Sequence, residues 1–487
     1  MIEQSLKCKT AKGLLWSSVE RFSVQGVQFL VLLVIARILD PADFGLVGML
    51  AIFLAIAQTL IDSGFSQALI RKQGRTETDN STVFYFNIAI SGLLYLFLFF
   101  IAPWVAEFYN EPQLCGLMRV LCLVVIINSF AVVQRALYTA SLDFKTQAKA
   151  SFVAAITSGS VGIFFAISGY GVWTLVWQQL LNAGVNTILL WLFSKWHPKL
   201  VYSRSSFKEL FSFGSKLMAS GLLDTIYNNM YTLIIGKVFN ATSLGYYYQA
   251  DRFTQLPSSN ITGIIQRVTY PILCSIQDDD ERLKTSFRRL LKLSAIVVFP
   301  LMSLLAGIST PLVSLILGEK WNFTATLIIP LSFMMMWWPL HVINLCLLQV
   351  KGRSDLFLKL EIIKKSVGVC VLAISIPFGL VFMCYASVLT SIICLIINTH
   401  YTGKLIQVDF ILQMKDLSKI LIASCVMFIV VILCVFFIKV HIYQLVIGIF
   451  VGVATFLFIC WLFNLSEIGY FISVLKENTI GRNDAFC

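Results

Sequence analysis

Residues 35–45 read IARILDPADFG, and residues 235–245 read IGKVFNATSLG. Both stretches begin with isoleucine, carry a basic residue at the third position and end with glycine. Two further stretches, APWVAEFYNEP at 102–112 and TPLVSLILGEK at 310–320, are similar to each other and follow in the same order. Because internal repeats decide architecture, these matches predict a chain built from two related halves.

The composition around these stretches is that of a protein buried in lipid. The 487 residues are 58% hydrophobic and 13% charged, and the mean hydropathy is +0.83. A soluble chain of this length would need far more polar surface. The net charge of +12 is spread through short loops without a zinc spacing or an RNA-binding signature, so we expect no nucleic-acid partner.

Fourteen mostly apolar stretches are each long enough to cross a bilayer, which needs about 20 residues per helix. The sequence therefore predicts an all-α integral membrane protein with fourteen transmembrane helices. The predicted spans are 14–37, 42–66, 83–105, 114–140, 148–169, 171–194, 210–236, 243–268, 287–309, 324–349, 356–378, 380–402, 417–438 and 442–463.

The positions of the basic residues predict the orientation of these spans. If the N-terminus lies inside, most of the 37 Lys and Arg residues, Arg135 among them, fall at inner ends or in inner loops. The outer ends hold only Arg37, Lys237, Lys320 and Lys439. Cytoplasmic loops collect Lys and Arg, so we predict that both termini are cytoplasmic.

The repeat and the span count together predict the domain organisation. A repeat of six helices gives two halves of the same orientation, related by an axis along the membrane normal. We predict an N-terminal lobe at 1–194, a cytoplasmic linker at 195–209 and a C-terminal lobe at 210–402. The remaining residues, 403–487, form two additional helices and a cytoplasmic tail.

Several ionisable side chains lie inside the predicted spans, where each charge costs at least about 2.5–3.5 kcal/mol on insertion scales. They fall in the first two spans of each half, which are expected to face each other across a central cavity. The predicted cavity residues are the cations Arg21, Lys216 and Arg252, the acids Glu20, Asp62, Asp224 and Asp251, and the polar residues Gln25, Gln28 and Asn228. The alternative for these charges is a structural ion pair that locks helices together, and for Asp62 it is simple solvation near the inner end of its span.

The sequence contains none of the motifs that bind nucleotides or carry out hydrolysis, such as a Walker A loop, a GxSxG turn or HExxH. The 12 cysteines lie mostly inside apolar runs, as buried small side chains do. We therefore predict no catalytic residue, no metal site and no cofactor. Energy would come from a gradient, with Na⁺ or H⁺ as the coupling ion, or from consumption of the product.

Three segments resemble a known family of transporters. They are LLWSSVERFSVQGVQFLVLLVIARILDPADFGLVGM at 14–49, LGYYYQADRFTQLPSSNI at 244–261 and YPILCSIQDDDERLKTSFRRLLKL at 270–293. Together with the six-helix repeat, they resemble the polysaccharide transporter branch of the MOP exporter superfamily. Within that branch, the sequence is most similar to flippases of the O-antigen and colanic-acid type.

This resemblance implies a function. Such proteins move an oligosaccharide linked to undecaprenyl pyrophosphate across the bacterial inner membrane by alternating access, for surface polysaccharide or lipopolysaccharide biosynthesis. Arg21, Lys216 and Arg252 would hold the anionic headgroup. Because Glu20 stands beside Arg21, the first helix is less cationic than in peptidoglycan-precursor flippases, which favours another glycolipid. The implied partners are membrane lipids, a polysaccharide polymerase and glycosyltransferases.

Two other functions stay open at this point. A multidrug or small-solute antiporter of the same superfamily, coupled to a cation, would have a more acidic cavity, and Lys216 and Arg252 argue against it. A membrane glycosyltransferase or polysaccharide polymerase would usually carry a large external catalytic loop. The outer loops expected here are short, the largest lying near 309–323.

Overall fold

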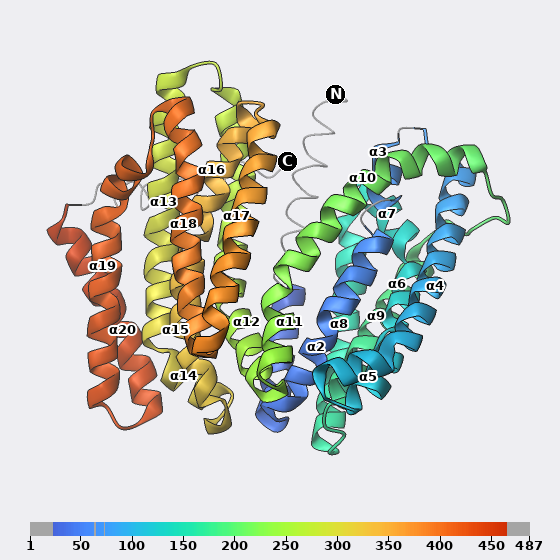
Figure 1. Cartoon of the computed structure of the whole chain (residues 1–487), viewed down its shortest axis with the longest axis horizontal. Coiled ribbons are helices and arrows are strands. Elements are labelled where there is room, and N and C mark those ends of the chain that lie inside the picture. Colours follow the sequence, from blue (N-terminus) through green and yellow to red (C-terminus); the bar gives the residue numbers. More distant parts are fainter. Residues whose placement is uncertain (1–22, 63–64, 73, 465–487) are drawn as a thin grey trace, which may run out of the picture. The chain divides into compact units, whose positions relative to one another are not determined.

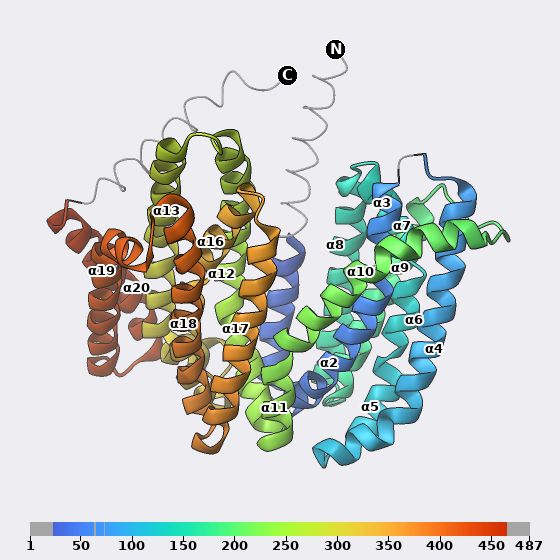
Figure 2. The ribbon, with the colours of Figure 1, turned by 45° about the horizontal axis from the view of Figure 1, so that its top comes forward.

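The computed structural model describes residues 23–62, 65–72 and 74–464 (Figures 1 and 2). Within these residues every regular element is an α-helix or a short 3₁₀ helix, and none is a strand. The chain divides into two compact units with a boundary between Gly245 and Tyr246, and each unit is described by itself below.

The first unit is a bundle of long helices interrupted by short breaks (Figure 1). Its helices are Ser23–Ile38, α2 (Pro41–Asp62), α3 (Phe65–Arg71), α4 (Glu77–Tyr109), α5 (Gln113–Leu121), α6 (Leu123–Ser129), α7 (Val132–Ala140), α8 (Phe144–Ile167), α9 (Trp173–Phe193), α10 (Arg204–Asn228) and α11 (Met230–Val238). Helix α2 contacts both α10 and α4, and α8 packs along α9.

The second unit contains most of α12 and all the helices that follow it. They are α12 (Ala241–Ser275), α13 (Asp280–Gly307), α14 (Ser309–Ile316), η1 (Glu319–Trp321), α15 (Asn322–Met336), α16 (Trp338–Val350), α17 (Ser354–Ser375), η2 (Ile376–Phe378), α18 (Leu380–Ile406), α19 (Phe410–Phe437) and α20 (His441–Leu462). Helix α13 is central to this unit and packs against α15, α16 and α19. Its buried core includes Phe299 and Trp337, whose rings meet edge to face at 5.3 Å.

These helices confirm the predicted all-α, multi-pass membrane protein. Among the described residues, 8 helices are long and apolar enough to cross a membrane, or up to 9 if the bent pair Gln113–Ser129 and Val132–Ala140 forms one span. Every stretch predicted between 83 and 463 lies mainly on helices. The exact number of fourteen spans stays a prediction, because α9, α10, α12 and α17 are too polar to pass the same test and Ser23–Ile38 is too short.

Some predicted boundaries shift. Helix α10 begins at Arg204, inside the predicted linker 195–209, because the Ser203 hydroxyl accepts a hydrogen bond from the Ser206 amide at 3.3 Å and caps the helix. The compact units also place α10 and α11 with the first half of the chain. The predicted lobe limits rest on the sequence repeat and stay a prediction.

The two glycines that end the repeated stretches make reciprocal contacts. A Cβ atom on Gly45 would lie 1.7 Å from the carbonyl oxygen of Ala241, and a Cβ atom on Gly245 would lie 1.8 Å from that of Pro41. Pro41 and Ala241 hold matching positions in the two stretches. Each glycine therefore contacts the other stretch at the same position, as in a contact with two-fold symmetry. This geometry supports the predicted repeat, and it shows why both stretches end in glycine.

A second pair of corresponding positions has positive φ angles at the ends of helices, although the ψ angles differ. Asn110, in the stretch 102–112, has a φ of 56° and ends α4. Gly318, at the matching position of the stretch 310–320, has a φ of 98° after α14. Asn and Gly are the residues that adopt positive φ most readily at helix ends. The two positions share only the sign of φ, since ψ is 35° at Asn110 and 167° at Gly318.

Candidate functional site

The residues predicted in the first span are only partly visible. Glu20 and Arg21 lie outside the described residues. Gln25 and Gln28 lie on the helix Ser23–Ile38, where Gln28 is exposed and Gln25 is half-buried. The Oε1 atom of Gln25 is buried and has no hydrogen-bond partner among the described residues.

Helix α10 carries three of the predicted residues. The backbone of Lys216 is helical, but its side chain lies outside what the structure describes. Asp224 and Asn228 are exposed and, four residues apart, share one face of the helix. The neighbouring Thr225 hydroxyl lies 2.8 Å from the Thr59 hydroxyl of α2, so this part of α10 lies against α2 through polar groups.

Asp251 and Arg252 on α12 are each held by a neighbour one turn away. The Gln255 amide donates to both carboxylate oxygens of Asp251, at 2.9 and 2.8 Å. The Arg252 guanidinium donates to the Tyr248 hydroxyl at 3.0 Å and lies 4.9 Å from the centre of its ring. The guanidinium therefore has a cation–π contact on one side and remains partly exposed on α12.

Asp62 belongs to a polar chain that crosses three helices of the first unit. Its carboxylate accepts a hydrogen bond from the Gln58 amide. The Gln58 carbonyl accepts from Asn128 on α6 at 3.0 Å, and the Asn128 carbonyl accepts from Arg135 on α7 at 3.4 Å. Asp62 and Arg135 also interact electrostatically. Asp62 is therefore held in a charged network rather than merely solvated at the inner end of its span.

A break in the fourth predicted span brings Arg135 to this network. The segments Gln113–Ser129 and Val132–Ala140 meet at an angle of 41°. The Trp191 indole N–H on α9 donates to the carbonyl of Phe130 at 2.9 Å, and the Thr187 hydroxyl donates to the carbonyl of Ile127 at 3.2 Å. Backbone groups left unpaired by a break inside a membrane need such partners. These two side chains therefore stabilise the bend.

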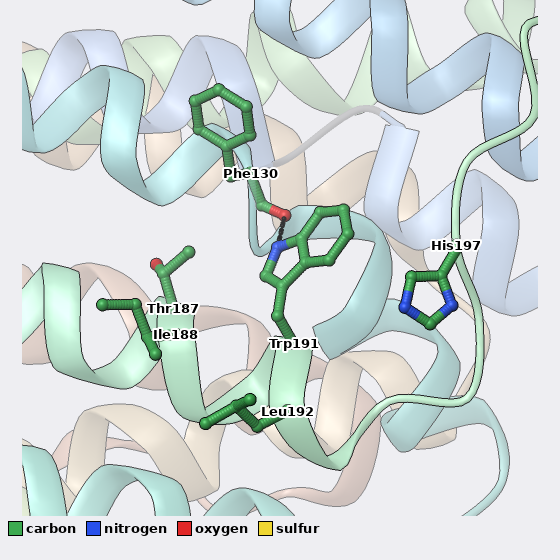
Figure 3. Close-up of a pocket in the computed structure, with 6 residues that line it drawn as sticks. All are labelled: Phe130, Thr187, Ile188, Trp191, Leu192 and His197. Carbon is green, nitrogen blue, oxygen red and sulfur yellow. Dashed lines mark hydrogen bonds between the residues drawn. The ribbon is translucent and has the colours of Figure 1, made fainter.

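The same bend forms one wall of a shallow groove (Figure 3). Trp191 stands at its centre, and the Ile188 and Leu192 side chains beside it are exposed. None of the predicted cavity residues contributes to it. The lining residues are Phe130, Thr187, Ile188, Trp191, Leu192 and His197. The lining is apolar and suits hydrocarbon chains rather than a charged headgroup.

Comparison with known proteins decides the family. Residues 34–326, more than half of the chain, match the family described as polysaccharide biosynthesis protein. The chain belongs to this polysaccharide biosynthesis protein family.

Relatives in this family have names from surface glycan synthesis. The chain is 28% identical to the lipopolysaccharide biosynthesis protein WzxC of Escherichia coli over 320 residues, which is 65% of each chain. It therefore spans slightly less than two thirds of the WzxC protein. It is 26% identical to the teichuronic acid biosynthesis protein TuaB of Bacillus subtilis over 359 residues, covering 72% of this chain and 73% of TuaB.

Solved structures confirm the fold. The lipid II flippase MurJ, in an inward closed conformation, superposes with a TM-score of 0.76 at 16% identity, covering 93% of this chain and 100% of MurJ. An inward-facing MATE multidrug transporter of the MOP superfamily superposes with a TM-score of 0.62 at 16% identity. The match covers 80% of this chain and 98% of the transporter. The predicted resemblance to the polysaccharide family is confirmed by the family match, and these structures confirm the fold. The prediction that the chain is not an enzyme agrees with this family and with these transporter structures.

For this member of the polysaccharide biosynthesis family, the sequence missed two polar clusters. From the sequence, Arg135 is predicted only to be a basic residue at the inner end of its span. The available signal is that Asn128 and Arg135, seven residues apart, share a helix face. In the second unit, the buried His341 lies 3.1 Å from both Ser391 and Asn398 of α18. His341 is isolated in the sequence, so only the packing of α16 against α18 reveals its partners.

Proposed function

We propose that this chain is a flippase for a lipid-linked oligosaccharide. In this proposal, it moves a repeat unit carried on undecaprenyl pyrophosphate from the inner to the outer leaflet of the bacterial inner membrane, for surface polysaccharide biosynthesis. The observation that carries the proposal is the family match over more than half of the chain. The fold shared with the lipid II flippase agrees with it.

The chemistry of the described helices fits an anionic headgroup. Arg252 is a half-buried cation on α12. A guanidinium carries five N–H donors in a planar fork that matches phosphate oxygens. We include Arg21 and Lys216 as further headgroup ligands and Glu20, Asp224 and Asp251 as groups that balance charge in the cavity.

The proposal includes a topology and a set of partners. Fourteen spans with both termini in the cytoplasm would place the loops that end in Gly45 and Gly245 at the outer face. The partners would be a polysaccharide polymerase and the glycosyltransferases that build the repeat unit. No cofactor is included, and Na⁺ or H⁺ is the proposed coupling ion. Reporter fusions that fluoresce only in the cytoplasm test this arrangement, with signal expected after residue 204 and none after residue 240.

Deletion of the gene, followed by lipid analysis, tests the function. The flippase predicts that the complete lipid-linked repeat unit accumulates and that surface glycan disappears. Expression of the intact chain should reverse both effects. If glycan and lipid intermediates are unchanged while tolerance to cationic drugs falls, the chain is an antiporter like the MATE transporters that share its fold.

A further inference from the structure

We propose that Arg135 is a diphosphate-binding residue at the inner end of the first unit. In the absence of substrate, the Asp62 carboxylate partly neutralises the charge of Arg135. This inference rests on the proposed flippase function and adds a site to it. Neither the family match nor the predicted cavity residues assign a role to Arg135.

The first argument is the way in which the two charges are connected. Three hydrogen bonds connect Arg135 to Asp62 through the side-chain amides of Asn128 and Gln58. The bond from Arg135 to Asn128 is long, at 3.4 Å, and it goes to a neutral amide oxygen. A phosphate oxygen accepts hydrogen bonds from a guanidinium more strongly than an amide does. The guanidinium is therefore held in place by a partner that a phosphate can replace.

The second argument is accessibility. Arg135 and Asp62 are both half-buried, so neither is sealed in the core of the bundle. The residues flanking Arg135 on α7, Gln134 and Ala136, are buried and anchor the helix. A long arginine side chain on such an anchored helix can present its head to a ligand while its stem packs on apolar surface.

The third argument is depth. Arg135 lies five residues before the inner end of the predicted span 114–140, and Asp62 lies four residues before the inner end of 42–66. At 1.5 Å per residue, both are about 6–8 Å from the predicted inner ends of these spans. Lipid phosphates lie just outside the hydrocarbon core, so the pair lies a short way deeper than the headgroups of the inner leaflet. The pair is therefore placed where a lipid-linked diphosphate begins its passage.

The fourth argument is that the protein builds the position of Arg135 with side chains from elsewhere. The bend after Phe130 is stabilised by Trp191 and Thr187 of α9, about 60 residues further along the chain. A straight helix would not need these bonds. Arg135 on α7, just past the bend, donates to Asn128 on α6, which in turn donates to Gln58 on α2.

Binding of undecaprenyl pyrophosphate to the full chain in nanodiscs tests the site. Arg135→Gln should weaken binding at least tenfold. Arg135→Lys should have an intermediate effect, because an ammonium lacks the bidentate fork. Asp62→Asn should tighten binding about threefold or more, because the competing carboxylate is gone. Inorganic pyrophosphate should compete with the lipid, and undecaprenol without phosphate should not bind.

The matched control is Arg119→Gln. Arg119 lies in the same predicted span but stacks on the Phe99 ring at 4.4 Å and donates to the Phe99 carbonyl, away from the polar chain. It should bind the lipid as the wild type does. If Arg135→Gln does not fold, Asn128→Asp replaces it, since a fixed carboxylate beside Arg135 should also weaken binding tenfold.

The outcomes separate this inference from the proposed function. If the wild-type chain binds the lipid and Arg135→Gln binds it equally well, the inference is wrong while the flippase proposal stands. The same holds if Asp62→Asn weakens binding, or if phosphatidylglycerol binds as tightly as the diphosphate lipid. If the wild-type chain neither binds the lipid diphosphate nor exports glycan, the flippase proposal itself fails.

Discussion

At the scale of single residues, Arg252 and Asp251 on α12 have neutral partners that satisfy their charges only in part. Arg252 rests on Tyr248, and Asp251 is held by Gln255, all on one helix. A tyrosine ring and an amide lower the cost of a charge in the membrane without cancelling it. Such residues keep an electrostatic field that a ligand can use.

Arg252 is a predicted cavity residue whose side chain the structure describes, so its role can be tested directly. Arg252→Ala should abolish complementation of a deletion strain at normal protein levels, and Lys216→Ala should do the same. Arg252→Lys should lower the transport rate about tenfold, because it retains the charge but loses the fork. Tyr248→Phe keeps the aromatic ring beside the guanidinium, so the transport rate should fall threefold or less. Full complementation by both alanine variants would remove these residues from the site.

Most of these residues were visible in the sequence, but their partners were not. Charge inside an apolar run identifies Asp62 and Arg252 without any structure. The pairing of Asp62 with Arg135 joins positions 73 residues apart through two amides, and no local pattern encodes it. The roles of Glu20 and Arg21 stay predictions, because these residues lie outside the described part of the chain.

At the scale of helices, the polar residues between apolar stretches predict where most helices begin and end. The Asp-rich stretch before α13 caps that helix, with Asp279 accepting from the Arg282 amide at 3.1 Å. The breaks inside the predicted span 114–140 were not predictable, because neither proline nor glycine marks them. Thr187 and Trp191 on α9 stabilise the second break, so tertiary contacts decided it.

The start of α4 is stabilised by a buried carboxylate. Asp79 accepts from the Thr76 amide at 2.9 Å and lies 3.0 Å from the Lys72 ammonium, which also contacts Glu209 at 2.9 Å. The hydrogen bond with Glu209, and the one with Asp79, raise the pKa of Lys72, so it stays protonated. Asp79 is 2% exposed and Glu209 is 63% exposed.

Asp79→Ala should therefore destabilise the protein by about 1–3 kcal/mol, because it removes a cap and leaves Lys72 with one partner. The exposed Glu209→Ala should cost less than about 1 kcal/mol. Thermal unfolding of both variants in the same detergent checks this order. Equal melting temperatures would show that the capping network contributes nothing.

The reciprocal glycines give a second prediction at this scale. Gly45→Ala and Gly245→Ala each place a methyl group against a backbone carbonyl, so α2 and α12 must move apart. We expect a loss of about 1–3 kcal/mol for each, as for other overpacked sites. Gly184→Ala on α9 meets nothing within 4 Å and should be neutral or stabilising. If Gly45→Ala and Gly184→Ala have the same melting temperature, the close contact at Gly45 does not exist.

At the scale of the whole molecule, two short sequence matches predicted a repeat that the structure supports. Gly45 and Gly245 each contact the other's stretch through a backbone carbonyl. The all-helical, multi-pass fold follows from the apolar helices. The number of spans stays a prediction, because α10 and α12 are long enough to cross a membrane but too polar to pass the test that the 8 helices pass.

The central claim is that this protein carries a lipid-linked oligosaccharide to the outer leaflet. The most direct measurement is the sidedness of that lipid in spheroplasts, probed by periodate, which does not cross the membrane and oxidises exposed glycan. With the wild-type chain, we predict that the glycan of the lipid is oxidised in intact spheroplasts. In cells depleted of the chain, it should be protected until the membrane is opened. Equal oxidation of the lipid-linked glycan in intact spheroplasts with and without the chain would contradict the account.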